Sequence, residues 1–200
     1  MVAGPNGSGK TTLTRWLRER GIDFGEYINP DDIALELEGS YDARVAQAQI
    51  LADRRRDALI AAKQSFSFET VMSHPSKIDI LMRAKAAGFF VQLYFVATDD
   101  PQTNVERVAL RVAQGGHDVP EDRIVARWHR TMGYLAQAVA AVDQANIFDN
   151  SDSEGAAGPR FLLRVESRPG AQIVSAQFPP IPAWAREYLV RPLRLSGVRR

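Results

Sequence analysis

Residues 4–11, Gly-Pro-Asn-Gly-Ser-Gly-Lys-Thr, are the stretch that decides the fold of this chain. They fill every position of the pattern G-x-x-x-x-G-K-[S/T], in which a glycine-rich loop runs into the first turn of a helix. Glycines tolerate positive φ and carry no Cβ, so successive backbone N–H groups can surround an anionic phosphate. A helix that begins at the lysine adds the partial positive charge of its N-terminus. The stretch therefore predicts a phosphate-binding P-loop.

The loop residues are expected to share one ligand, a nucleoside triphosphate such as ATP. Lys10 is expected to reach the β- and γ-phosphates, and the Thr11 hydroxyl to bind Mg²⁺. The alternative is a glycine-rich turn that matches by chance, and it is disfavoured because all positions fit and a helical pattern follows at once. The other residues expected to bind the nucleotide are Gly4, Pro5, Asn6, Gly7, Ser8, Gly9 and Thr12.

Beyond the loop, segments with helical periodicity alternate with short apolar segments typical of strands. Residues 89–98 are the strongest strand, because nearly all of them are apolar or aromatic, as in a strand buried on both faces. The other predicted strands cover 26–29, 65–70 and 147–148. The predicted helices cover 10–20, 31–38, 42–63 with Asp42 as N-cap, 75–87, 101–115, 120–130 and 131–144.

This alternation predicts βαβ crossovers and so an α/β fold of the P-loop NTPase type, with a nucleotide-kinase-like, mainly parallel sheet flanked by helices. Only two or three strand residues precede Gly4, and we expect the natural start to lie upstream. Residues 161–166 and 172–177 predict a small C-terminal β-hairpin, followed by a short helix. We expect a P-loop domain at 1–151 and, at 152–200, an extension packed on the same domain.

Composition excludes several classes of protein. The chain has no cysteine, which rules out zinc–thiolate and iron–sulfur sites, thiol catalysis and disulfides. No run approaches the roughly 18 apolar residues of a membrane span, so we expect a cytoplasmic protein with no membrane partner. The net charge of +1 does not favour a nucleic-acid partner. We interpret Arg54, Arg55 and Arg56 as a solvated helix face.

Acidic residues follow the predicted strand at 26–29, in the sequence Asn29-Pro30-Asp31-Asp32. An acid at the carboxyl end of such a strand lies over the ligand crevice of the sheet. There it can accept the proton of an attacking hydroxyl, as the aspartate of a kinase does. The alternative is that these acids only cap the following helix. We expect one acid to cap and the other to catalyse, with Asp31 as the catalytic base.

Glu69 ends an otherwise apolar predicted strand, where burial of a carboxylate without a partner would be costly. We expect Glu69 to contact a hydroxyl of the substrate or water bound to Mg²⁺. The alternative is an ordinary salt bridge at the strand end. The chain shows neither a Walker-B strand nor an Asn-Lys-x-Asp segment that selects guanine, which disfavours a GTPase.

Arginines are spaced along 107–130, on either side of Gly115-Gly116. This pattern is typical of a lid that closes over a triphosphate and neutralises its charge. Arg111 and Arg127 are the preferred catalytic pair because they flank the glycines. The alternative is that most of these arginines face solvent. A zinc site built from His74, His117 and His129 is disfavoured by their scattered spacing.

Together these motifs resemble the zeta-toxin family of P-loop kinases, in particular its short, stand-alone members. The resemblance covers residues 2 to about 151. The segments that carry it are Gly-Pro-Asn-Gly-Ser-Gly-Lys-Thr-Thr, Ile-Asn-Pro-Asp-Asp-Ile-Ala, Phe-Ser-Phe-Glu-Thr-Val-Met-Ser-His and Arg-Val-Ala-Gln-Gly-Gly-His-Asp-Val-Pro.

The resemblance implies an ATP-dependent kinase that requires Mg²⁺ and phosphorylates the 3′-hydroxyl of a sugar nucleotide such as UDP-N-acetylglucosamine. It also implies a possible antitoxin partner that blocks the nucleotide site. By motif, Lys10 and Thr11 match the P-loop pair and Asp31 the catalytic base. Glu69 matches an acid near the substrate or metal, and Arg111 with Arg127 the lid arginines. The sequence departs from the family pattern at 31–64, which would shape the acceptor pocket, and at its short start.

Two other functions stay open at this point. One is a kinase of another metabolite or of an antibiotic on the same scaffold, because the acceptor pocket depends on the variable segment 33–64. The other is a nucleotide-binding regulator with little catalysis. Lys10, Asp31 and Glu69 together argue against the regulator, since a protein that only binds a nucleotide needs no acid at that strand end.

Overall fold

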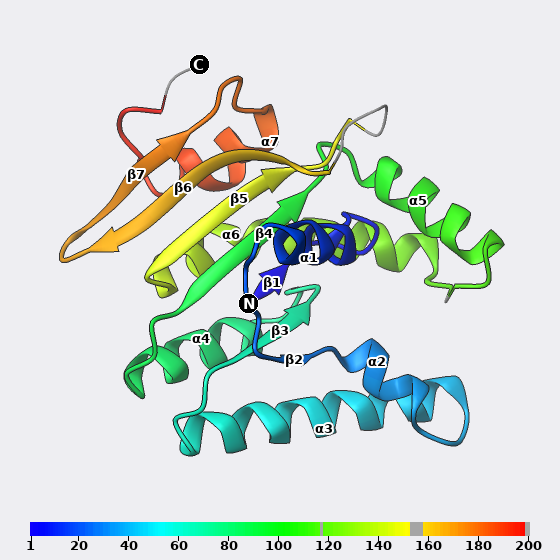
Figure 1. Cartoon of the computed structure of the whole chain (residues 1–200). Helices are drawn as coiled ribbons and strands as arrows, with labels where there is room; N and C mark the ends of the chain where they lie inside the picture. Colours follow the sequence, from blue (N-terminus) through cyan, green and yellow to red (C-terminus); the bar gives the residue numbers. More distant parts are fainter. Residues whose placement is uncertain (117, 153–157, 199–200) are drawn as a thin grey trace.

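A seven-stranded sheet runs through the protein in the order β2-β3-β1-β4-β5-β6-β7 (Figure 1). The computed structural model describes residues 1–116, 118–152 and 158–198. Neighbouring strands from β2 to β5 are parallel, and the pairs β5–β6 and β6–β7 are antiparallel. The strands are β1 (Val2–Ala3), β2 (Glu26–Ile28), β3 (Phe66–Thr70), β4 (Gln92–Ala97), β5 (Gln144–Asp149), β6 (Arg160–Arg168) and β7 (Ala171–Gln177).

The helices lie on both faces of this sheet, as the crossovers between parallel strands require. Leu13 and Leu17 of α1 pack on one face, whereas α4, α6 and the C-terminal helices contribute to the larger core. The helices are α1 (Lys10–Glu19), α2 (Pro30–Leu35), α3 (Tyr41–Ala61), α4 (Ser76–Ala86), α5 (Pro101–Ala113), α6 (Glu121–Ala141), α7 (Ala183–Ala185) and the π-helix η1 (Arg186–Val190).

The central strands are buried on both faces, because successive side chains point into different cores. In β4, Phe95 belongs to the larger core and Val96 to the core under α1. Ile147 and Phe148 of β5 alternate in the same way. All four side chains are at most 3% exposed. This double burial is why the sequence of β4 reads as a continuous apolar run, and it confirms the predicted α/β fold class.

Three predicted element boundaries are wrong. Ser40, not Asp42, caps α3, because its extended backbone lets its side chain accept a hydrogen bond from the N–H of Ala43. The two helical segments predicted at 120–130 and 131–144 form one helix, α6, which ends at Ala141. Its buried stripe, which includes Trp128 and Thr131, passes through the expected break. Strand β5 begins at Gln144, where a helix was expected.

The C-terminal hairpin extends the sheet. Strand β5 pairs with β6 from Gln144 to Asp149, and β7 forms the free edge (Figure 1). The chain then returns to the core, where Trp184 is 3% exposed and its ring centroid lies 6.4 Å from that of Phe95. Trp184 Nε1 also donates to Asp149 Oδ1 at 3.3 Å. The division into 1–151 and 152–200 stays a prediction. Among the described residues, no helix combines the length and the apolar character that crossing a membrane requires.

The packing of Phe95 gives a first prediction. Phe95 is fully buried, so Phe95→Ala should lower the free energy of unfolding by about 3–5 kcal/mol, as measured by urea denaturation. The matched control is Phe90→Ala, because Phe90 is 69% exposed and its loss should change stability by less than about 0.5 kcal/mol. Similar effects of the two substitutions would contradict this description of the core.

Candidate active site

The P-loop leaves β1, turns at three glycines and enters α1 at Lys10. Gly7 has a φ of 73°, and a Cβ added there would lie 2.6 Å from the carbonyl oxygen of Asn104. Both the backbone conformation and the space around it therefore require glycine. Gly9 caps α1 in the left-handed conformation, which brings the chain directly into the helix.

Two asparagines from distant parts of the chain brace the loop. Asn104 of α5 donates through Nδ2 to the carbonyl of Asn6, and its Oδ1 accepts a hydrogen bond from Thr98. Asn150, directly after β5, donates through Nδ2 to the carbonyl of Ser8 at 2.9 Å. The loop carbonyls are thus held by side chains of the scaffold, which fixes the loop conformation. Sequence reasoning missed both asparagines, because each lacks a local motif.

The charges of all the other predicted catalytic residues affect the pKa of Lys10. Its Nζ donates to the carbonyl of Pro5 at 3.1 Å. Burial lowers the pKa of Lys10, and the Arg111 and Arg127 guanidinium groups add to the lowering. The carboxylates of Glu69 and Asp31 oppose it. The structure therefore gathers four predicted side chains, from α2, β3, α5 and α6, around the Lys10 ammonium group of α1.

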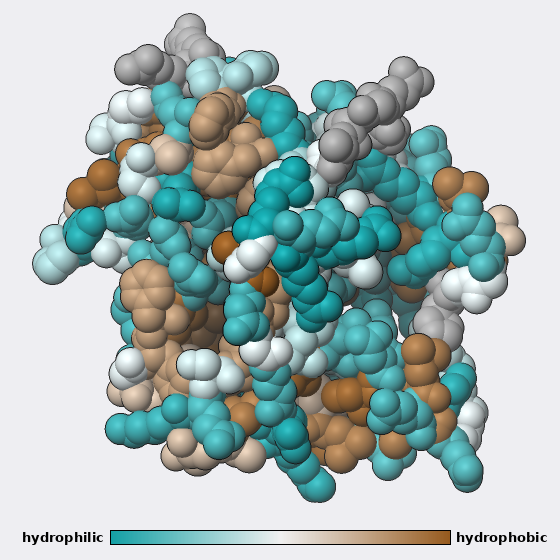
Figure 2. Space-filling view, in the orientation of Figure 1, coloured by the Kyte–Doolittle hydropathy of each residue, from teal (hydrophilic) through white to brown (hydrophobic). Residues whose placement is uncertain are grey.

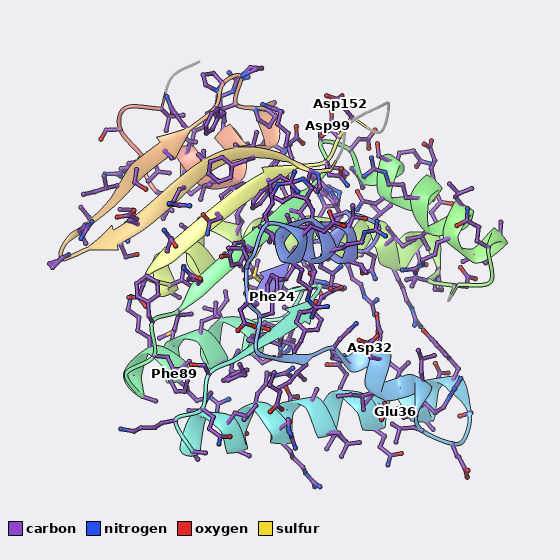
Figure 3. The ribbon with its side chains drawn as sticks, viewed as in Figure 1. Phe24, Asp32, Glu36, Phe89, Asp99 and Asp152 are labelled. Carbon is purple, nitrogen blue, oxygen red and sulfur yellow. The ribbon has the colours of Figure 1, made fainter. Side chains whose placement is uncertain are left out.

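These residues line a cleft of about 1180 Å³. Gly4, Pro5 and Ser8 lie buried behind its wall, whereas Asn6, Gly7 and Gly9 to Thr12 form part of it. Asp32 of α2 and Asp152, two residues of the lining, lie far apart in Figure 3, below and above α1. The remaining walls come from α2 and α3, from the end of β3 with the start of α4, and from α5 and α6.

Asp31 and Asp32 both lie in the first turn of α2 and are exposed. The cap of this helix is Asn29, whose Oδ1 accepts a hydrogen bond from the N–H of Asp31 at 3.1 Å. The expectation that one of the acids caps the helix is therefore wrong, because Pro30 takes the first helical position and places Asn29 before it. Both acid side chains remain available to the cleft that they line.

Glu69 is 8% exposed and has a specific partner in the neighbouring strand. The hydroxyl of Tyr27 donates to Glu69 Oε2 at 2.7 Å and lies 3.3 Å from the Thr14 hydroxyl of α1. Burial and the Glu69 carboxylate raise the pKa of Tyr27, so its hydroxyl stays a proton donor. The carboxylate is thus fixed by a neutral donor from β2, which sequence reasoning missed.

The arginines of α5 and α6 divide between cleft and solvent. Arg107, Arg111, Arg123 and Arg127 line the cleft, and Arg127 Nη1 donates to Asn6 Oδ1 at 3.5 Å. Arg130 is exposed outside it. Burial lowers the pKa of Arg107, and the carboxylates of Asp149 and Asp99 oppose this shift. His117, from the disfavoured zinc set, lies outside the described residues, and the lid itself stays a prediction.

Arg56 corrects the interpretation of the basic run in α3. Arg54 and Arg55 are exposed, as expected for a solvated helix face. The Arg56 side chain is only 1% exposed and lines the cleft. Its guanidinium group lies over the Phe68 ring, with 4.9 Å between the central carbon and the ring centroid, a favourable contact for a buried cation. A run of three arginines gives no sign of which one turns inward.

The sequence of this chain matches known proteins. The family model described as Zeta toxin matches residues 1–154. A protein of Haemophilus influenzae, described as uncharacterized, is 33% identical over 132 residues, which make up 64% of this chain and 90% of that protein.

Solved structures share the fold. One comes from the PezAT chromosomal toxin–antitoxin system of Streptococcus pneumoniae, with 17% identity and a TM-score of 0.61 over 100% of this chain and 78% of that chain. Another is the AvrRxo1-ORF1:AvrRxo1-ORF2 complex with sulphate ions, with 17% identity and a TM-score of 0.65 over 99% of this chain and 63% of that chain. The same complex with ATP gives 16% identity and a TM-score of 0.60. At these identities the likeness shows a common fold.

The bond between Tyr27 and Glu69 gives a second prediction. Tyr27→Phe removes a donor to a buried carboxylate and should lower the free energy of unfolding by about 1–3 kcal/mol in urea denaturation. The control is Tyr134→Phe, because Tyr134 is also partly buried but makes no hydrogen bond through its hydroxyl among the described residues. Its loss should change stability by less than about 0.5 kcal/mol. Equal effects would show that the Glu69 contact contributes nothing.

Proposed function

The chain belongs to the Zeta toxin family, and from this premise and the geometry of the cleft we propose that it is an ATP-dependent kinase of a small hydroxyl-bearing molecule. One observation carries the proposal. The Lys10 ammonium of the P-loop, the Asp31 and Glu69 carboxylates and four arginines of α5 and α6 line the same cleft. A phosphate-binding loop that faces two acids has what phosphoryl transfer needs, namely charge stabilisation and a base.

The residues present fit ATP and Mg²⁺. The glycines let the loop backbone lie against Val96, Asn104 and Asn150, where a Cβ would clash, and the Ser8 hydroxyl is buried without a hydrogen-bond partner among the described residues. Gly4 to Thr12 would hold the phosphates. The exposed Thr11 hydroxyl would bind Mg²⁺ together with phosphate oxygens, since Mg²⁺ prefers oxygen ligands. Bound ATP·Mg²⁺ supplies the phosphoryl group and offsets its negative charge.

Each side chain has a defined task in the transfer. Asp31 accepts the proton of the acceptor hydroxyl as that oxygen forms its bond to the γ-phosphorus, while the bond from the γ-phosphorus to the bridging oxygen of ADP breaks. Lys10, Arg111 and Arg127 stabilise the charge that spreads over the transferred group. Glu69, held in place by Tyr27, orients the acceptor hydroxyl or metal-bound water.

For the acceptor we propose a sugar nucleotide such as UDP-N-acetylglucosamine. The resemblance in the motifs at 4–12, 28–34 and 66–74 supports this choice. A kinase of another metabolite or of an antibiotic is the second candidate, because α2 and α3 form part of the acceptor side of the cleft and the 31–64 segment departs from the family pattern.

We also propose an antitoxin protein as a partner, because the structures that share the fold come from a toxin–antitoxin system and from a two-protein complex. Exposed apolar side chains of α2 and α3, among them Leu35, Ile50 and Leu51, offer a contact area beside the cleft. Figure 2 shows hydrophobic side chains gathered at the lower right, over these helices. The test is whether the product of a small neighbouring gene binds this chain and blocks its binding of ATP.

The catalytic assignment gives a third prediction. Asp31→Asn should bind ATP normally but lose about 10²–10⁴-fold in the rate of phosphoryl transfer, because the amide cannot accept the proton. Asp32→Asn is the matched control, since Asp32 is the adjacent exposed acid of the same helical turn. Its rate should stay near that of the unmodified chain. Unchanged turnover in Asp31→Asn would overturn the role of Asp31.

The reaction itself gives a fourth prediction. A mass-spectrometric screen of metabolite pools incubated with the chain, ATP and Mg²⁺ should reveal a product that gains one phosphoryl group. Addition of EDTA and the Lys10→Ala substitution should each abolish this product, since the first removes the metal and the second a phosphate contact. ATP binding without a product from any pool would favour the nucleotide-binding regulator instead.

A further inference from the structure

The carboxylate of Asp149, at the end of β5, joins the C-terminal segment to the loop that follows this strand. Asp149 is only 6% exposed. Trp184 Nε1 donates to its Oδ1 at 3.3 Å, and Arg160 Nη2 donates to its Oδ2 at 3.1 Å. Ser151 donates to Oδ1 through its hydroxyl at 2.6 Å and through its N–H at 3.3 Å. Side chains from the C-terminal segment and from the loop after β5 thus meet on one buried acid.

Ser151 extends this network to Arg107 of α5. The Ser151 hydroxyl also accepts a hydrogen bond from the N–H of Asp99 at 3.0 Å, so the ends of β4 and β5 both hold this residue. Figure 3 shows Asp99 next to Asp152, above α1. The Ser151 carbonyl accepts a hydrogen bond from Arg107 Nη2 at 3.5 Å. The position of the Arg107 side chain therefore depends on a loop that the Asp149 carboxylate fixes.

Arg107 lines the cleft beside the P-loop. Asn104 lies three residues earlier in α5, and so on the same face of the helix, and it donates to the carbonyl of Asn6. In the loop after β5, Asn150 donates to the carbonyl of Ser8 at 2.9 Å. Residues on both sides of Arg107 therefore contact the P-loop, which places Arg107 at the nucleotide end of the cleft.

The guanidinium group of Arg107 has unused donors. Its Nη1 is buried with no hydrogen-bond partner among the described residues, and its Nη2 makes the long bond to Ser151. Burial also lowers the pKa of Arg107, because the charged form loses contact with water. An anion bound beside such a cation restores hydrogen bonds that water no longer supplies.

We propose that Trp184 and Arg160 position Arg107 against the bound nucleotide. They act through Asp149 and Ser151 and touch no substrate, since neither lines the cleft. The inference rests on the proposed function, because it assigns a contact in the nucleotide site of that function. Trp184 and Arg160 both lie beyond residue 154, where the family match ends. The C-terminal segment therefore takes part in nucleotide binding without forming any part of the P-loop.

The experiment measures the affinity for a non-hydrolysable ATP analogue by calorimetry and needs no turnover. Arg107→Met should weaken binding about 10- to 100-fold, because it removes a charged donor. Trp184→Phe keeps an aromatic ring against Phe95 but removes the donor to Asp149, and it should weaken binding about 3- to 10-fold. The double variant should bind no more weakly than Arg107→Met alone, because Trp184 acts only through Arg107. A purely structural role of Trp184 would instead make the two losses additive.

The matched control is Trp128→Phe. Trp128 is 4% exposed, and its Nε1 is buried with no hydrogen-bond partner among the described residues. This variant therefore loses a buried indole but no hydrogen bond, and it should bind the analogue like the unmodified chain. Urea denaturation shows whether each variant folds. If Trp184→Phe does not fold, Arg160→Met provides the test, since Arg160 is 40% exposed and is the other side-chain donor from the C-terminal segment to Asp149.

Two outcomes would overturn the proposal. One is an unchanged affinity in Arg107→Met or in the folded variant of the C-terminal segment. The other is an equal loss from the C-terminal substitution whether Arg107 is present or not. Failure of the unmodified chain to bind the analogue would instead contradict the proposed kinase function.

Discussion

The parallel pairing of β2, β3 and β1 is the constraint on which the site depends. These three strands are neighbours in the sheet and run in one direction, so the residues that follow them meet at one edge. The P-loop follows β1, Asp31 follows β2, and Glu69 lies near the end of β3. The sheet thus brings a phosphate-binding loop and two acids together from segments that are far apart in sequence, as open α/β sheets do.

The walls of the cleft carry charges of both signs. Cations of α1, α5 and α6 surround the P-loop, and those of α3 and α4 lie on another wall. The acids Asp31 and Glu69 line the same cleft. Because burial lowers the pKa of Lys10, a phosphate bound beside it would stabilise the charged form of an ammonium group that water solvates poorly. The proposed reaction depends on this electrostatic arrangement.

Much of the fold was predictable, because local patterns carry it. The apolar run of β4 reflects burial on both faces of the sheet. The hairpin at β6 and β7 follows from the alternation of apolar and polar residues on both sides of a turn. Errors arose where local signals competed. Ser40 and Asp42 are both good caps, and only the backbone conformation of Ser40 selects it. Within α6, helical periodicity alone did not show that one buried stripe continues past Thr131.

By itself, the sequence determined the P-loop, because its glycines, lysine and threonine act through backbone geometry within a few residues. It also indicated Asp31 and Glu69, since an acid at the end of an apolar strand is unusual. Only the tertiary structure decided which partners hold them. Asn104, Asn150 and Tyr27 reach the site from other elements, and the buried Arg56 lies over the Phe68 ring. Such contacts join residues distant in the chain, so no local pattern encodes them.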